Sequence, residues 1–253
     1  MKPHEFNATA RAPGAGVTEA ARIIIVGTGF SGLCAGVKLR EMGEDHFIML
    51  ERAADVGGTW RDNNYPGCGC DVPSHLYSFS FAPNPEWSRV FSTQAEIHAY
   101  LRGCVERFEL RPRIRFNADV QGAVWDEASA CWTVTLAGGE QLRARVLITG
   151  MGQLSRPAIP KLPGLADFSG PSFHSARWDH GCDLQGKHVA VIGTGASAIQ
   201  FVPAIAPQAR RLHVFQRSAP YFLPRADRAY RDWEKALFRH VPAAMKLHRL
   251  WIY

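Results

Sequence analysis

Two stretches of this chain share one order of residues: a short aliphatic run, a glycine-rich turn and a helix-forming segment. The first is RIIIVGTGFSGLCAGVKLREMG, which starts at Arg22, and the second is KHVAVIGTGASAIQFVPAIA, which starts at Lys187. Continuous aliphatic runs are typical of strands that are buried on both faces of a parallel sheet. Each stretch is followed by another apolar run. The sequence therefore predicts two β-α-β units, over residues 22–51 and 187–217.

The segment between the two units follows a different pattern. The stretch IRFNADVQGAVWDEASACWTVTLAGGEQLRARVLIT, residues 114–149, alternates apolar and polar side chains and carries a turn at Gly138-Gly139. This alternation is typical of strands with one face exposed to water. We therefore expect an α/β protein with two Rossmann-like domains, the first of which carries an antiparallel β-meander.

Helices are also indicated outside the two units. Thr93 and Glu96 have the spacing of a capping box and are followed by apolar residues at helical intervals. The last stretch, DRAYRDWEKALFRHVPAAMKLHRLWIY, reads as helical with Pro242 interrupting it. It reaches Tyr253 without a glycine or a polar tail, so we expect the chain to stop inside an element.

The composition excludes several classes of protein. With 253 residues, of which 46% are hydrophobic and 21% are charged, the chain is neither disordered nor fibrous. The net charge of +6 comes from scattered Lys and Arg residues, which fits anionic small molecules and predicts no nucleic-acid partner. No apolar run is long enough to span a membrane, and the irregular spacing of the cysteines predicts a reducing, cytoplasmic setting. The oligomeric state is not predicted.

The first glycine-rich turn has the spacing Gly27-x-Gly29-x-x-Gly32 between a strand and a helix. There, the first glycine allows a tight turn, the second lets a pyrophosphate approach the backbone, and the third lets the helix pack closely on the strand. The helix N-terminus attracts the anion. Glu51 ends the next strand, where a carboxylate can accept hydrogen bonds from an adenosine ribose. This pattern predicts a dinucleotide site.

The second unit repeats the motif as Gly193-x-Gly195-x-x-Ala198, but its following strand ends differently. The residue that corresponds to the acid of the first unit is Gln216, and Arg217 comes next. A carboxylate would repel a ribose 2′-phosphate, whereas an arginine binds it, so this site is predicted to prefer NADPH to NADH. Hydride transfer needs a donor and an acceptor in one water-poor crevice, which predicts FAD in the first site and NADPH in the second.

Further motifs lie between the two glycine turns. The loop FSGPSFHSARWDH carries Phe168, Gly170, His174, Trp178 and Asp179 at fixed offsets, and the block DVGGTWRDNNYPGCGCDVPSHLYSFSF occupies residues 55–81. The loop resembles the fingerprint of the Baeyer–Villiger monooxygenases, which ends in Trp-Pro or Trp-Asp, and the block resembles their flavin-contacting segment. The stretch GQLSRPAIPKLPGLADFSG is similar to the crossing between their two domains.

This resemblance implies where the cofactors bind. FAD would contact Gly27, Gly29, Phe30, Ser31, Gly32, Glu51, Gly58, Thr59, Trp60, Asp71, Val72, Tyr77, Val120 and Gln153. NADPH would contact Gly193, Thr194, Gly195, Ala196, Ser197, Ala198, Gln200, Arg217 and Ser218. In the family, an aspartate at the position of Asp71 orients an active-site arginine, which implies a catalytic role here. The fingerprint loop is implied to be an interdomain linker that responds to NADPH.

The resemblance also implies a division of the chain. We expect a flexible tail over residues 1–18, an FAD-binding domain over 19–153, an NADPH-binding domain over 154–222 and the start of a helical insertion over 223–253. Family members are considerably longer than this chain. Both domains are therefore expected to be incomplete, and the active-site arginine to lie in the missing part.

The function implied is that of an FAD- and NADPH-dependent monooxygenase. One oxygen atom of O₂ would be inserted into a small-molecule ketone, through a C4a-peroxyflavin, to give an ester or lactone. Oxidation of nitrogen or sulfur, and a truncated fragment that binds nucleotides without catalysis, stay open as alternatives. The pair Cys68-x-Cys70 with His75 raises the question of a zinc site or a redox disulfide, but its spacing suits neither, so no metal is expected.

Overall fold

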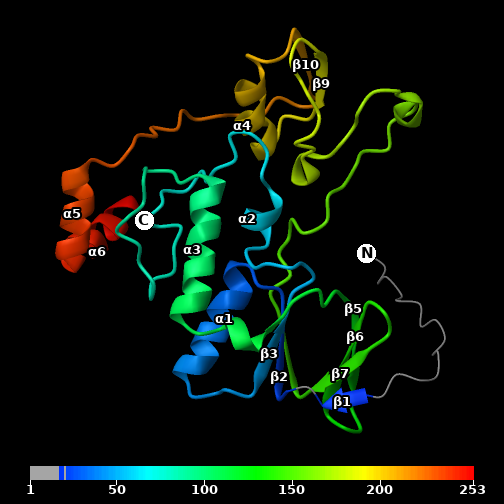
Figure 1. The fold of residues 1–253 in the computed structure, drawn as a ribbon, viewed down its shortest axis with the longest axis vertical. Coiled ribbons are helices and arrows are strands. Elements are labelled where there is room, and N and C mark those ends of the chain that lie inside the picture. The colour runs from blue at the N-terminus through cyan, green and yellow to red at the C-terminus, as the bar shows by residue number, and fades with distance from the viewer. Residues whose placement is uncertain (1–16, 20) are drawn as a thin grey trace.

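A four-stranded parallel sheet forms the base of the structure, a computed structural model that describes residues 17–19 and 21–253 (Figure 1). The strand order is β4-β3-β2-β8. Its strands are β2 (Ile23–Val26), β3 (Phe47–Leu50), β4 (Ile114–Arg115) and β8 (Val146–Thr149). Because β2 lies between β3 and β8, its carboxyl end opens at the middle of the sheet edge. This is the edge at which ligands bind in open α/β sheets.

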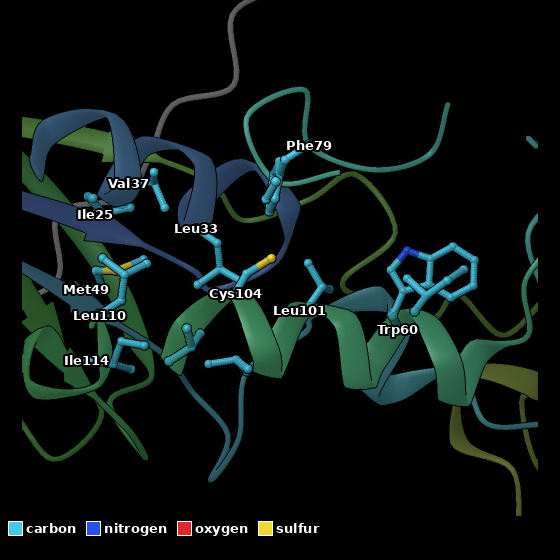
Figure 2. Close-up of a cluster of buried hydrophobic side chains, with 14 of the residues drawn as sticks. Ile25, Leu33, Val37, Met49, Trp60, Phe79, Leu101, Cys104, Leu110 and Ile114 are labelled. Atoms are coloured by element: carbon cyan, nitrogen blue, oxygen red, sulfur yellow. The ribbon is translucent and has the colours of Figure 1, made fainter. Parts of the chain in front are cut away.

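Helices α1 (Phe30–Glu41) and α3 (Gln94–Arg107) enclose the main hydrophobic core with this sheet. Figure 2 shows Leu33 of α1 next to Cys104 of α3, and Val37 and Leu101 belong to the same buried cluster. The apolar positions recur at three- and four-residue intervals, so each helix turns one stripe inward. Gly43, with φ of 76°, ends α1 as the sequence predicts.

The second sheet has the order β1-β7-β6-β5, with β1 (Val17–Glu19), β5 (Val120–Asp126), β6 (Cys131–Leu136) and β7 (Gln141–Ala144). The meander prediction is confirmed for β5 to β7, which pair antiparallel. It is wrong for residues 114–115 and 146–149, which join the parallel sheet as β4 and β8. The apolar run of β8 pairs with the buried strand β2 inside the parallel sheet. Alternation of apolar and polar residues is typical of half-exposed strands and does not apply to a strand in this setting.

The predicted tail of residues 1–18 ends in ordered structure. Residues 17–19 form β1 and pair parallel with β7. The rest of the predicted tail lies outside the described residues.

The second β-α-β unit is confirmed. Strands β9 (His188–Ile192) and β10 (Arg211–Phe215) pair parallel, and α4 (Ala196–Ile205) connects them. Figure 1 shows this unit at the opposite end of the molecule from the parallel sheet. Three 3₁₀ turns, η1 (Arg111–Arg113), η2 (Leu165–Asp167) and η3 (Ser175–Arg177), and the one-turn helix α2 (Thr59–Asp62) lie in connecting segments.

The predicted capping box does not form at α3. Thr93 is the N-cap residue, as expected, but its side chain makes no capping hydrogen bond. Glu96 instead accepts hydrogen bonds from the backbone N–H of Ser88 (2.6 Å) and from its hydroxyl (2.9 Å). The Glu96 carboxylate thus bonds to the neighbouring loop at Ser88 and not to the start of its own helix.

Helices α5 (Asp232–His240) and α6 (Pro242–Ile252) form a hairpin, which confirms that Pro242 separates two helical segments. In the described part of the chain, no helix is long and apolar enough to cross a membrane. All six cysteines lie in the described part and are free thiols.

The helical hairpin packs on a buried histidine. The His75 ring is 3% exposed, and its centroid lies 4.6 Å from that of Phe238, 5.2 Å from Tyr230 and 5.3 Å from His248. Its Nε2 atom has no hydrogen-bond partner among the described residues. Burial, followed by the charges of His248 and Arg249, lowers the pKa of His75 to about 4. The ring is therefore neutral in the folded chain at neutral pH.

This burial predicts acid sensitivity. Below the ordinary pKa of 6.5 the unfolded chain binds a proton that the folded chain excludes until about pH 4, so the free energy of unfolding falls over that window. His75→Phe keeps the aromatic packing and removes the titration. In urea unfolding, the free energy of unfolding of the variant should fall by about 2 kcal/mol less between pH 7 and pH 5 than that of the parent chain. His180→Phe, at an exposed position, is the control, and equal losses in all three chains would contradict the expectation.

Candidate functional site

A cavity of about 560 Å³ opens at the carboxyl ends of β2 and β3. Its wall combines the first glycine turn, the end of β3, the segment around α2, the residues that follow β8 and part of the fingerprint loop. The predicted cofactor residues that line it are Gly27, Gly29, Phe30, Ser31, Glu51, Gly58, Thr59, Trp60, Tyr77, Val120 and Gln153. Residues from seven separate stretches of the sequence thus meet at one cavity.

The glycine turn presents the N-terminus of α1 to this cavity. A Cβ atom on Gly32 would lie 1.9 Å from the Gly27 carbonyl oxygen, so only glycine lets the helix approach the strand this closely. The first hydrogen bond of the helix runs from the Leu33 N–H to the Gly29 carbonyl (3.0 Å). The amides of the first turn have no partner within the helix and suit an anion such as a pyrophosphate.

Glu51 lies beside this turn with its carboxylate held from several sides. Oε2 accepts hydrogen bonds from the Thr28 N–H (3.1 Å) and hydroxyl (2.6 Å). Oε1 accepts from the Ala53 N–H (3.0 Å) and from Arg61 Nη1 (2.8 Å). The residue is 4% exposed, so this ion pair and these hydrogen bonds offset the cost of burying its charge.

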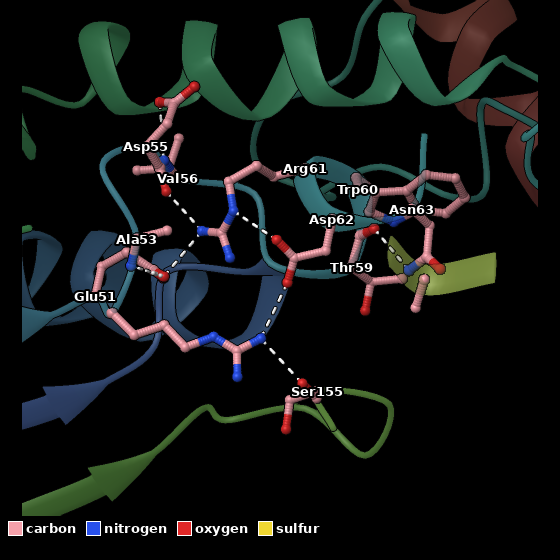
Figure 3. Close-up of polar contacts among 12 residues, drawn as sticks. Glu51, Ala53, Asp55, Val56, Thr59, Trp60, Arg61, Asp62, Asn63 and Ser155 are labelled. Carbon is pink, nitrogen blue, oxygen red and sulfur yellow. Dashed lines mark hydrogen bonds and ion pairs between the residues drawn. The ribbon is translucent and has the colours of Figure 1, made fainter. Parts of the chain in front are cut away.

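The charge network continues beyond Glu51 (Figure 3). Arg61 also donates to the Asp55 carbonyl (2.6 Å) and to Asp62 Oδ1 (2.8 Å). Arg52 donates to Asp62 Oδ2 and to the Ser155 carbonyl, both at 3.0 Å. Burial works to raise the pKa of Asp62, but the hydrogen bonds and charges of Arg61 and Arg52 outweigh it and hold that pKa below its ordinary value.

Sequence reasoning missed Arg52, Arg61 and Asp62, which line the cavity. The adjacent opposite charges of Arg61 and Asp62, shortly after the Gly57-Gly58 turn, were the available signal. A pair of neighbouring charges usually marks a solvated surface, and only the tertiary structure turns this pair toward Glu51.

Of the predicted FAD-contacting residues, Gly32, Asp71 and Val72 do not line the cavity. Asp71 is exposed, and Val72 packs against the main core. Tyr77 does line the cavity, and Trp60 Nε1 donates a hydrogen bond to its hydroxyl (3.0 Å). Burial raises the pKa of Tyr77, and electrostatic interactions with Cys70 and Asp71 add to that shift.

The fingerprint loop connects the cavity to the second unit. His174 Nδ1 accepts a hydrogen bond from the Ala176 N–H (3.1 Å) and caps η3, of which Ala176 and Arg177 line the cavity. The Trp178 ring packs on Phe201 of α4 (5.2 Å between centroids).

The other three fingerprint residues make local contacts. The ring of Phe168, which is largely exposed, lies over Gly170, where a Cβ atom would come within 2.7 Å of it. Asp179 Oδ1 accepts a hydrogen bond from the Gly181 N–H (2.9 Å). These contacts shape the loop, and neither involves the cavity wall.

The space beside the second glycine turn, at the N-terminus of α4, is open and is called the cradle below. A Cβ atom on Gly193 or Gly195 would meet no atom of the described residues within 4 Å, while Ala198 in the third position is buried. Arg217 and Ser218 are exposed just beyond β10. Gln200, in contrast, turns its side chain toward the first half of the chain, where it bonds to Gly69 and Tyr65.

Comparison with known proteins identifies the family. The profile of the flavin-binding monooxygenase-like family matches residues 20–247. The chain belongs to this family. It is 54% identical over 237 residues to a Baeyer–Villiger monooxygenase of Streptomyces coelicolor. The matched region covers 93% of this chain and 46% of that protein. A Baeyer–Villiger monooxygenase of Pseudomonas aeruginosa is 51% identical over 232 residues, which covers 92% of the chain and 44% of that protein. The resemblance to Baeyer–Villiger monooxygenases is thus confirmed.

Solved structures agree with this assignment. An oxidised steroid monooxygenase bound to NADP superimposes with a TM-score of 0.80 at 42% identity, over 88% of this chain and 44% of that one. Cyclohexanone monooxygenase in its closed form gives a TM-score of 0.82 at 34% identity, over 90% of this chain and 44% of that one. This member of the flavin-binding monooxygenase-like family spans less than half the length of these relatives.

The Glu51–Arg61 pair predicts an effect on cofactor affinity. Arg61→Met removes the cation that orients the Glu51 carboxylate, and the loss of a charge-assisted hydrogen bond should weaken FAD binding about tenfold or more. Quenching of FAD fluorescence measures the dissociation constant. Arg22→Met, which removes an exposed ion pair with Glu44, is the control and should leave the dissociation constant of FAD unchanged. Equal affinities of the two variants would contradict the role given to Arg61.

Proposed function

We propose that this chain binds FAD in the cavity beside Gly27 and NADPH at the glycine turn of the second unit. Within this proposal, residues 19–153 form the FAD-binding domain, residues 154–222 the NADPH-binding domain and residues 223–253 the start of a helical insertion. The observation that carries it is the pair of glycine turns at the N-termini of α1 and α4, with Glu51 beside the first and Arg217 after the second.

The cavity beside Gly27 suits the adenosine and pyrophosphate of FAD. The amides at the start of α1 would hold the pyrophosphate. Because four donors already surround the Glu51 carboxylate, a ribose hydroxyl would share an oxygen or replace a donor. Trp60 and Tyr77 would exclude water from the flavin end, since their hydrogen bond fixes both rings in the wall.

The reaction that this arrangement supports is oxidation of a small ketone by O₂ to an ester or lactone, with NADPH as reductant. Bound FAD supplies the redox chemistry by accepting a hydride and reducing O₂. Asp71 would orient an arginine from the part of the longer relatives that this chain does not match. Its carboxylate is exposed and so is accessible to such a partner.

A second candidate function is cofactor binding without turnover by this chain alone. Its support is the exposure of apolar side chains on the two-stranded sheet of β9 and β10, where Ile192 and Phe215 are each 56% exposed. Apolar surfaces of this kind are normally covered by further protein. The chain also spans less than half the length of the Baeyer–Villiger relatives.

One experiment separates these functions. The purified chain is mixed with FAD and passed over a desalting column, and the flavin spectrum of the protein fraction is recorded. NADPH oxidation and product formation are then followed with a panel of ketones, amines and thioethers. Bound flavin with an ester product supports the monooxygenase, N- or S-oxides support heteroatom oxidation, and bound flavin without product supports cofactor binding alone. Absence of bound flavin would overturn the proposal.

The choice between NADPH and NADH is predicted to depend on Arg217. Arg217→Gln removes the guanidinium that would pair with the 2′-phosphate, so NADPH affinity should fall about tenfold or more while NADH affinity stays unchanged. Isothermal titration with each nucleotide measures this. Arg210→Gln, an exposed arginine at the start of the same strand region, is the matched control. A parallel fall for both nucleotides would argue against 2′-phosphate recognition.

A further inference from the structure

The side chain of Gln200 joins the second unit to the turn over residues 65–71, called the Tyr65–Asp71 turn below. Gln200 Oε1 accepts hydrogen bonds from the Gly69 N–H and from the Tyr65 hydroxyl, each at 3.1 Å. Gln200 Nε2 donates to the Gly69 carbonyl at 2.9 Å. The amide therefore pairs with both backbone groups of Gly69, as a neighbouring strand would. A reversed amide would place donor against donor, so the orientation is specific.

Apolar packing surrounds this polar contact. Phe201, next to Gln200 on α4, packs edge-on against Tyr65 (5.9 Å between centroids). At Gly67, where φ is 77°, a Cβ atom would lie 2.7 Å from the Gln200 carbonyl oxygen. Only glycine therefore lets the turn approach α4 this closely. The contact is thus a packed interface between segments that are more than a hundred residues apart.

Residues outside the second unit also hold the Tyr65–Asp71 turn. The Cys70 N–H donates to the Ser92 carbonyl, and the Gln94 N–H donates to the Cys68 carbonyl, both at 2.9 Å. Arg225 Nη1 donates to the Cys70 carbonyl (2.8 Å). The turn is consequently fixed between α3 on one side and α4 on the other. A displacement of α4 would be transmitted to it.

We propose that Gln200 is a positioning residue that couples the second glycine turn to the Tyr65–Asp71 turn. The sequence resemblance places Gln200 among the NADPH ligands, but its acceptor oxygen and one of its two N–H groups are committed to Gly69 and Tyr65. Gln200 lies one helical turn after Ala196, where α4 begins at the open cradle. The coupling part rests on the proposed function, because it requires a nucleotide in that cradle and a role for Asp71.

The donors of this contact persist at neutral pH. Burial raises the pKa of Tyr65 to about 12, and among smaller causes the charges of Cys68 and Asp71 also raise it. The Tyr65 phenol therefore keeps its proton in ordinary buffers.

Hydrogen exchange of the Gly69 amide tests the contact directly, because that amide donates to Gln200. In the cofactor-free chain, Gln200→Met should speed exchange of Gly69 about tenfold, and Tyr65→Phe, which removes one hydrogen bond, should speed it less. Gln208→Met makes the same change at an exposed glutamine of the second unit and should have no effect. Unchanged exchange at Gly69 in Gln200→Met would overturn the contact.

NADP⁺ titration tests the coupling. NADP⁺ should slow Gly69 exchange in the parent chain, whereas Gln200→Met should bind NADP⁺ with affinity within about twofold of the parent and show no such slowing. A tenfold loss of NADP⁺ affinity with unchanged Gly69 exchange would instead make Gln200 a ligand. If Gln200→Met does not fold, Gln200→Glu, which loses the Nε2 donor to the Gly69 carbonyl, provides the same comparison. If the parent chain does not bind NADP⁺, the coupling fails together with the proposed function, while the cofactor-free exchange still decides the contact.

Discussion

The close approach of helix α1 to strand β2 determines where everything else in the cavity lies. Gly32 packs directly on the Gly27 carbonyl, and no side chain fits between them. The approach brings Leu33 and Val37 into the core and points the start of the helix at the carboxyl end of the sheet. A larger residue at this position would move the helix outward. The cavity would then lose both its anion-binding amides and its shape.

Buried charge, rather than apolar packing, completes the wall of that cavity. Glu51 and Asp62 are each held by an arginine, and the network runs from the end of β3 to the carbonyl of Ser155, beyond β8. Charged groups in such a position must be paired, because an isolated buried carboxylate is costly. The same pairing orients the carboxylate before a ligand arrives. Pre-orientation lowers the entropy cost of binding, which fits a tightly held cofactor.

The second unit contacts the first half through a small mixed interface. Its apolar part consists of the buried residues Tyr65, Val191, Ala198, Phe201 and Ile205, with Trp178 of the fingerprint loop packed against them. Its polar part is the pairing of Gln200 with Gly69. The contact between the two units therefore combines aromatic packing with directional hydrogen bonds. The fingerprint loop contacts both the cavity and this interface. A change at one of these places would therefore affect the other through the loop.

Several features could be predicted from the sequence because they depend on neighbouring residues. Aliphatic runs followed by glycine turns specified both β-α-β units, and Pro242 marked the break between two helices. The spacing of the glycines and the position of Glu51 indicated the cavity. Features that depend on partners distant in the chain were missed or mistaken. The strand over residues 146–149 was assigned to the meander because its pairing with β2 is invisible locally, and Glu96 bonds to Ser88 rather than to its own helix end.

The sequence by itself therefore determined the elements and the two glycine turns, since backbone conformation at a glycine and burial of an aliphatic run are local properties. The tertiary structure alone decided which charges meet. Arg61 reaches Glu51, and Gln200 reaches Gly69, only after strands and helices far apart in the chain have packed together. Hydrogen bonds and ion pairs act over a few ångströms, so their partners are set by the packing of the fold and cannot be read from spacing along the chain.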